Sequence, residues 1–132
     1  MDTRKRRELI ATVDSADPRS DFLVTLTDSR RLEALGCTVD IAVRYVPDRC
    51  VVETSAWNAY LDTVAEQPVR CLEDIAALLL GDIADVIIPR WCAVTVSVDE
   101  NGCHRVTVSD RQPNWEDKEG LIMLERIVGG AS

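Results

Sequence analysis

Strict alternation runs through Cys37-Thr-Val-Asp-Ile-Ala-Val-Arg-Tyr-Val46. One face of this segment carries the apolar side chains Val39, Ile41, Val43 and Tyr45, and the other face carries Thr38, Asp40, Ala42 and Arg44. A period of two is the period of a β-strand with one buried face. The segment therefore predicts a half-buried antiparallel strand, and the rest of the chain is interpreted outward from it.

The flanking segments predict two helices between two pairs of strands. In chain order these are strands at 22–27 and 37–46, helices at about 54–67 and 71–84, and strands at 91–98 and 103–109. The charged segment 28–36 is predicted to be a loop, and a short edge strand is expected at 10–13. This ββααββ order predicts an α+β fold, with a four-stranded antiparallel sheet and a helical pair on one face. Open sheet edges favour pairing between subunits, which predicts a homo-oligomer.

Local signals set the expected boundaries. Thr54 or Ser55 can cap the start of the first main helix, and Pro68 ends it. Asn101-Gly102 predicts a two-residue hairpin, and a short helix is expected at 119–128. The chain divides into an N-terminal arm (1–20), one folded domain (21–110) and a C-terminal tail (111–132). The basic run 4–7 is expected to be a solvated, frayed end.

Composition excludes several classes of function. The chain has 132 residues and a net charge of −8, which disfavours nucleic acid as a partner. No apolar run reaches the roughly 20 residues that span a bilayer, and no signal peptide is recognisable. We therefore expect a cytoplasmic protein without a membrane partner. Its five cysteines are odd in number and lack a CxxC pair, which predicts reduced thiols and no metal site.

Four short motifs carry a resemblance to a known family. They are Tyr45-Val-Pro-Asp48, Val52-Glu53-Thr54, Tyr60-Leu61 and Pro89-Arg90-Trp91. Together they resemble the NADPH-dependent 7-cyano-7-deazaguanine (nitrile) reductases, which belong to the tunnelling-fold superfamily. The similarity extends from about residue 36 to residue 103. It implies strands that assemble into an oligomeric barrel, and a purine-, deazapurine- or pterin-like ligand bound between subunits.

The resemblance also implies substrate-binding residues. The family triplet that touches the substrate corresponds to Val52, Glu53 and Thr54, and a family His-Glu pair corresponds to Leu72 and Glu73, with the histidine lost. A carboxylate suits this task because its two oxygens accept paired N–H donors from a heterocycle. The alternative is that Glu73 only favours the start of its helix through the helix dipole.

The departures from the family argue against its reaction. Arg30 falls where the family has its nucleophilic cysteine, and Cys37 falls where it has its acidic aspartate. The lysine of the family motif at 53–56 and the arginine of its hairpin at 101–103 are also lost. Because those basic residues serve NADPH in the family, we expect no nicotinamide cofactor and no nitrile reduction.

Other side chains remain as candidates for chemistry. Cys37 and Cys71 are candidate nucleophiles, although free cysteines commonly serve as small core residues. Asp40 is a further candidate, with a solvated ion pair to Arg44 as the alternative. His104 is the only histidine, and a surface or packing role is expected for it.

The favoured expectation is a divergent enzyme that binds a purine-, deazapurine- or pterin-like heterocycle at a subunit interface. It would catalyse a non-reductive step in modified-nucleobase or specialised-metabolite biosynthesis. Two alternatives stay open. In one, the chain is a non-catalytic ligand-binding or structural partner of a tunnelling-fold enzyme in a mixed oligomer. In the other, the similarity reflects the fold alone.

Overall fold

A four-stranded antiparallel sheet forms the centre of the protein. The computed structural model describes residues 2–100 and 102–123. Its sheet has the order β2 (Val24–Leu32), β3 (Cys37–Val46), β5 (Trp91–Val98) and β6 (His104–Arg111). β1 (Thr12–Asp14) and β4 (Cys50–Val52) form a separate antiparallel pair. This arrangement confirms the α+β class and the antiparallel ββααββ core, while the barrel assembly stays a prediction.

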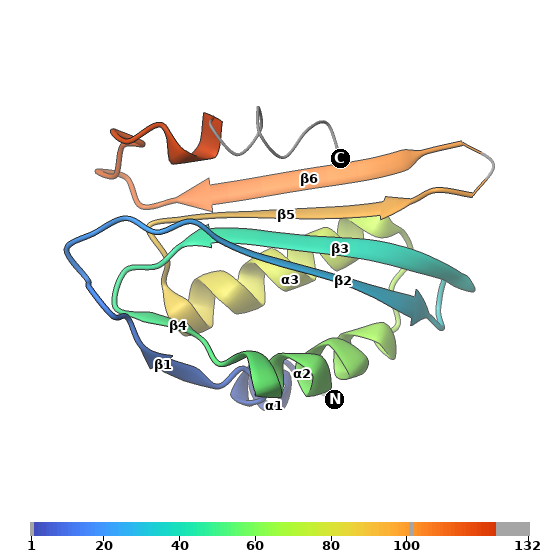
Figure 1. Cartoon of the computed structure of the whole chain (residues 1–132). Coiled ribbons are helices and arrows are strands. Elements are labelled where there is room, and N and C mark those ends of the chain that lie inside the picture. The colour runs from blue at the N-terminus through green and yellow to red at the C-terminus, as the bar shows by residue number, and fades with distance from the viewer. Residues whose placement is uncertain (1, 101, 124–132) are drawn as a thin grey trace.

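The helices α1 (Thr3–Glu8), α2 (Thr54–Ala65) and α3 (Leu72–Ile87) lie on one face of the sheet (Figure 1). The alternation in β3 is confirmed, because Val39, Ile41 and Val43 are buried while Asp40 is exposed. In the register of the central strands, Val43 lies opposite Val94, which is also buried. The main core therefore lies between the sheet and the helices.

The prediction of a loop at 28–36 is wrong for residues 28–32, because β2 continues to Leu32, and correct for residues 33–36, which form the turn to β3. The charged half of β2 remains a strand because the charges have partners. Arg30 donates from Nε to Asp62 Oδ1 at 2.9 Å and from Nη2 to Asn58 Oδ1 at 2.9 Å, both on α2. These contacts fix the end of the edge strand to a helix far away in the sequence.

Three predicted boundaries also need correction. Glu53 caps α2, in place of Thr54 or Ser55, and its carboxylate accepts from Ser55 N at 3.0 Å. Val98 pairs with His104, so the β5–β6 loop spans residues 99–103 and is longer than a two-residue hairpin. α3 runs three residues beyond the predicted end, to Ile87. The second half of the predicted helix at 119–128 lies outside the described residues, and residues 121–123 of its first half are helical.

The expectation of a frayed basic N-terminus is wrong. The segment forms α1, and the side chain of Arg6 is only 8% exposed. It donates two hydrogen bonds to Asp82 of α3, a carboxylate that is fully buried. Ile10, also in the predicted arm, belongs to the main core. The first helix is thus tied to the folded domain by a buried ion pair.

Two of the resemblance motifs meet at one corner of the protein. Arg90 N donates to Val46 O at 2.8 Å, and the Arg90 side chain contacts Asp48 at 3.3 Å and Asp21 at 2.8 Å. In the same corner, Tyr45 Oη accepts a hydrogen bond from Val52 N at 2.9 Å. The Pro-Asp turn and the Pro-Arg-Trp segment therefore hold the ends of β3 and β5 together.

Residues 112–123 lie on the sheet face opposite the helices, near this corner (Figure 1). There Trp115 and Ile122 pack against a small cluster that contains Val46, Trp91 and Ala93. The rest of that face, towards the two hairpins, is polar.

Candidate functional site

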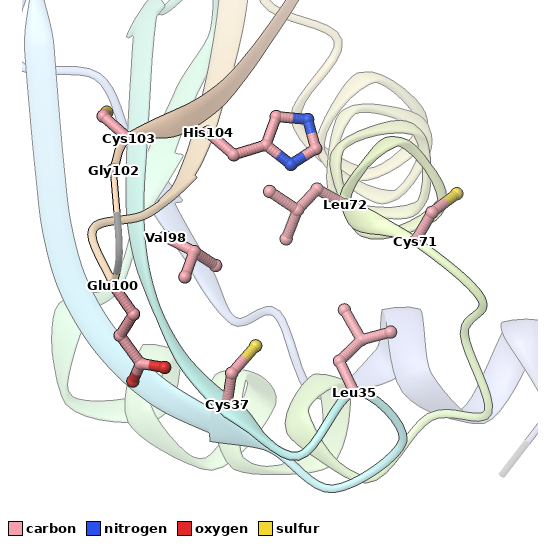
Figure 2. A pocket seen from close by; sticks show the side chains of 9 residues that line it. All are labelled: Leu35, Cys37, Cys71, Leu72, Val98, Glu100, Gly102, Cys103 and His104. Carbon is pink, nitrogen blue, oxygen red and sulfur yellow. The ribbon is translucent and has the colours of Figure 1, made fainter.

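A pocket of about 390 Å³ lies at the end of the protein that carries the two hairpins. Three parts of the chain form it: the β2–β3 turn with the start of β3, the start of α3, and the β5–β6 loop. Figure 2 shows its lining residues, which are Leu35, Cys37, Cys71, Leu72, Val98, Glu100, Gly102, Cys103 and His104. The structure thus brings together three of the residues predicted from the sequence, namely Cys37, Cys71 and Leu72.

The three thiols of this pocket differ in direction (Figure 2). The Cys37 side chain points into the pocket, towards Val98. The side chains of Cys71 and Cys103 point away from its centre. All are free thiols, with Cys37 and Cys71 partly buried and Cys103 exposed. Cys37 is therefore the thiol best placed to meet a molecule bound in the pocket.

Glu73 lies beside the pocket and contacts one of its walls. Its Oε1 is 3.9 Å from Nε2 of His104, and both side chains are largely exposed. Glu73 belongs to the first turn of α3, directly after the pocket residue Leu72. The next residue, Asp74, accepts hydrogen bonds from Arg70, and these bonds hold the pKa of its carboxyl below the ordinary value. Of these two carboxylates, Glu73 is the one paired to the pocket wall.

Glu53 lies at the other end of the helical pair. It caps the start of α2, whereas Glu73 lies at the start of α3, next to where α2 ends. Ser55 donates from Oγ at 2.5 Å and from its backbone N–H, and these bonds lower the pKa of Glu53. Of its neighbours, Val52 is buried in the core and Thr54 is exposed. Within a single chain, Glu53 and Glu73 therefore do not lie side by side.

Two other positions from the sequence analysis lie away from the pocket. Arg30 is held by α2, as described above. Asp40 lies on the polar face of the sheet, where it lines a second hollow, of about 620 Å³. Arg44 and Asp99 line the same hollow. Asp40 therefore belongs to a different surface from Cys37, Cys71 and Leu72.

Sequence reasoning missed the role of His104 in the pocket wall. Its position depends on the five-residue loop and on the pairing of His104 with Val98, which place the first residue of β6 beside the start of α3. The uniqueness of this histidine is a signal that could have drawn attention to it.

Within residues 2–100 and 102–123, no group of three or more His, Cys, Asp or Glu side chains is arranged to hold a metal ion. No helix in this part of the chain is long and apolar enough to cross a membrane.

Comparisons with known proteins agree with this fold. No family model matches the chain. It is 24% identical over 113 residues to the NADPH-dependent 7-cyano-7-deazaguanine reductase of Syntrophus aciditrophicus (strain SB), and the match covers 80% of each protein. Its fold resembles the crystal structure of the archaeosine synthase QueF-Like in the apo form. That likeness has a TM-score of 0.53 and 15% identity, and covers 70% of this chain and 95% of the other.

This chain is a tunnelling-fold relative of the 7-cyano-7-deazaguanine reductases. The relation confirms the resemblance carried by the short motifs. The chain departs from these reductases at Arg30. This arginine stands where the resemblance places the family nucleophile, and its side chain is hydrogen-bonded to α2. Of the residues that the resemblance assigns to the substrate, Leu72 lines the pocket and Glu73 lies beside it, whereas Glu53 lies at the start of α2.

Proposed function

We propose that this protein binds a purine-, deazapurine- or pterin-like heterocycle in the pocket at the start of α3. The observation that carries the proposal is the position of that pocket, which is lined by Leu72 and Cys37 and has Glu73 at its rim. Apolar walls from Leu35 and Val98 suit a flat ring, and the Glu73 carboxylate suits its N–H edge. The proposed reaction is a non-reductive step in modified-nucleobase or specialised-metabolite biosynthesis in the cytoplasm.

The proposed site is shared between two protomers. Glu53 and Glu73 lie at opposite ends of the helical pair, so a ligand that contacts both must lie between two chains. The open edges β2 and β6 offer unpaired backbone groups for such an assembly. Glu53, Val52 and Thr54 of one chain would then complete the pocket at Leu72 and Glu73 of another. A homo-oligomer is the simplest assembly, and a mixed oligomer with another tunnelling-fold chain would serve equally.

Calorimetry with a panel of heterocycles tests the binding. The panel contains guanine, 7-cyano-7-deazaguanine with its 7-carboxy and 7-aminomethyl relatives, GTP and pterins, each with and without NADPH. We expect one class to bind, independently of NADPH, and Glu73→Ala to weaken it about ten- to hundredfold because a charged hydrogen-bond acceptor is lost. Glu66→Ala is the control, since Glu66 is exposed at the end of α2. Absence of binding by every member would contradict the proposal.

Mixing two defective variants tests whether the site is shared. Glu53→Ala and Glu73→Ala are each expected to bind poorly alone. After dissociation and reassembly together, some interfaces carry both intact glutamates, and part of the binding returns. Recovery only in mixed samples supports a shared site. The shared site would be contradicted if light scattering gave the molar mass of a monomer, or if Glu53→Ala bound the heterocycle normally.

A non-catalytic role is the second candidate, and one observation favours it. Arg30 occupies the position at which the resemblance places the nucleophile, and its guanidinium is held by Asp62 and Asn58. A protein that binds the heterocycle tightly and leaves it unchanged over long incubation would have this role. Conversion of the bound heterocycle, followed by mass spectrometry, would exclude it.

A further inference from the structure

We propose that the pocket at the start of α3 selects heterocycles that carry a cationic group, and that Glu100 sets this preference. Glu100 lines the pocket from the β5–β6 loop. The inference rests on the proposed function for the class of ring, and it adds the charge that the ligand carries. Anionic relatives of the same ring are then rejected by the same carboxylate.

The wall of the pocket contains a carboxylate and no permanently charged cation. Glu100 is the acidic member of the nine lining residues, and none of the nine is a lysine or an arginine. The Glu100 side chain is exposed, and within residues 2–100 and 102–123 its carboxylate has no hydrogen bond or ion pair. Its negative charge therefore acts on a molecule that enters the pocket.

The arginines that adjoin the pocket residues in sequence are directed elsewhere. Arg70 precedes Cys71, but its side chain is 88% exposed and hydrogen-bonded to Asp74. Arg105 follows His104 in β6, and successive residues of a strand face opposite sides of the sheet. Its side chain accordingly lines the hollow on the polar face of the sheet. A phosphate or carboxylate group in the pocket would thus meet neither guanidinium.

His104 is the lining side chain that can become cationic, and a carboxylate stands beside it. Its Nε2 is 3.9 Å from Oε1 of Glu73. The positive charge of a protonated imidazole would therefore be opposed by Glu73 before it attracted an anionic ligand. With Glu100 added, the two carboxylates outweigh one imidazolium, so the surroundings of the pocket stay negative in either state of the histidine.

The two glutamates approach the pocket from different sides. In Figure 2, Glu100 lies on the same side of the pocket as Cys37. Leu72 and His104 lie on the other side, and Glu73 directly follows Leu72 in α3. A flat ring whose N–H edge meets Glu73 therefore turns its opposite edge towards Glu100. The preferred cationic group is a substituent on that opposite edge.

Two thiol reagents of opposite charge test the potential of the pocket without any heterocycle. Cys37 is the probe, because its side chain points into the pocket (Figure 2). The full-length protein is treated with 2-(trimethylammonium)ethyl or 2-sulfonatoethyl methanethiosulfonate, and initial rates at each cysteine are followed by peptide mass spectrometry. The ratio of the cationic to the anionic rate at Cys37 should be about tenfold higher in the native protein than in urea.

Glu100→Gln should lower this ratio at Cys37 to about threefold or less, because an exposed charge acts on its neighbours over a short range. Glu116→Gln is the matched control, since it removes the same charge from an exposed position next to Trp115, at the other end of the sheet. The assignment would be overturned by a native ratio no higher than the ratio in urea. Equal losses in the two variants, both shown to be folded by urea denaturation, would overturn it as well.

Calorimetry with two matched heterocycles decides the question even where Cys37 reacts with neither reagent. The 7-aminomethyl and 7-carboxy relatives of 7-cyano-7-deazaguanine share one ring and carry opposite charges. An exposed charge contact changes an affinity by up to about fivefold, and it counts here once as attraction and once as repulsion. We therefore expect the 7-aminomethyl relative to bind about tenfold more tightly, and Glu100→Gln to bring the two affinities within about threefold of each other.

The outcomes separate this inference from the proposed function. Equal binding of the two relatives, or tighter binding of the 7-carboxy relative, would keep the heterocycle site and overturn the charge preference. Absence of binding by every heterocycle would contradict the proposed function. In that case a Glu100-dependent preference of Cys37 for the cationic reagent would still support a pocket that selects cations, and its absence would overturn the inference too.

Discussion

Arg6 and Asp82 form a buried ion pair across 76 positions of sequence. Arg6 donates from Nε to Oδ2 of Asp82 at 2.6 Å and from Nη2 to Oδ1 at 2.9 Å. Arg7 Nε and Tyr60 Oη donate to the same carboxylate at 2.8 and 2.7 Å. One buried carboxylate thus joins α1, α2 and α3.

Replacing Asp82 with Ala is expected to lower the free energy of unfolding by about 3–5 kcal/mol, because Arg6 keeps a charge that is buried without a partner. Asp85→Ala is the matched control on the same helix. Asp85 is 61% exposed and lies 3.4 Å from Arg7, so its loss should cost less than about 1 kcal/mol. Urea denaturation followed by circular dichroism measures both, and equal losses would contradict the role of Asp82.

The same carboxylate predicts loss of stability in acid. Burial acts to raise the pKa of Asp82, but the hydrogen bonds from Arg6, Arg7 and Tyr60 outweigh it and hold the pKa below its ordinary value. A depressed pKa in the folded state contributes stability above the unfolded pKa of about 3.9, and this contribution is lost as the pH falls through the folded pKa. The melting temperature should change little from pH 7 to 5 and fall below about pH 4. Asp82→Asn should show a smaller acid-induced fall than the unsubstituted protein.

Tyr45→Phe removes the acceptor of a buried backbone hydrogen bond. Tyr45 is buried, and its Oη accepts from Val52 N at 2.9 Å. Without it, the N–H of Val52 loses its partner, which should cost about 1–3 kcal/mol. Hydrogen exchange at the Val52 amide provides a local measurement, since its protection should fall more than that of amides in β3. Unchanged protection would show that another acceptor takes over.

Cys92 should be the slowest of the five cysteines to alkylate. Burial, with a smaller contribution from Asp110, raises the pKa of its thiol to about 12, and the side chain is almost fully covered. The native protein should leave Cys92 unmodified while the exposed Cys103 reacts. In urea the two rates should converge. Early modification of Cys92 under native conditions would mean that β5 opens locally.

The central strands were predicted correctly because the side chains that are buried there are the ones that are apolar in the sequence. β3 and β5 have their predicted bounds, since each presents apolar side chains to the helices at every second position. The charged half of β2 was missed because its pattern makes sense only with Asn58 and Asp62 in place. Asp82 was overlooked for the same reason, as a polar residue in an apolar stripe whose partners lie far away in the sequence.

The site was predictable only in part. The resemblance pointed to Leu72 and Glu73, and Cys37 and Cys71 were candidate nucleophiles from the sequence. That Cys37 and Leu72 share one cavity follows from strand register and helix placement, which no local pattern encodes. The wall position of His104 depends on the length of one loop. The separation of Glu53 from Glu73 likewise became visible only once the ends of α2 and α3 were located.

The Asp82 contact also bears on the order in which the chain is completed on the ribosome. The six residues of α1 are too few to hold a helix in water by themselves. They leave the ribosome before their partner carboxylate, which follows about seventy-six residues later. The buried contact of α1 therefore cannot form until most of the domain has been synthesised. A segment made early thus reaches its final conformation only after α3 has been made.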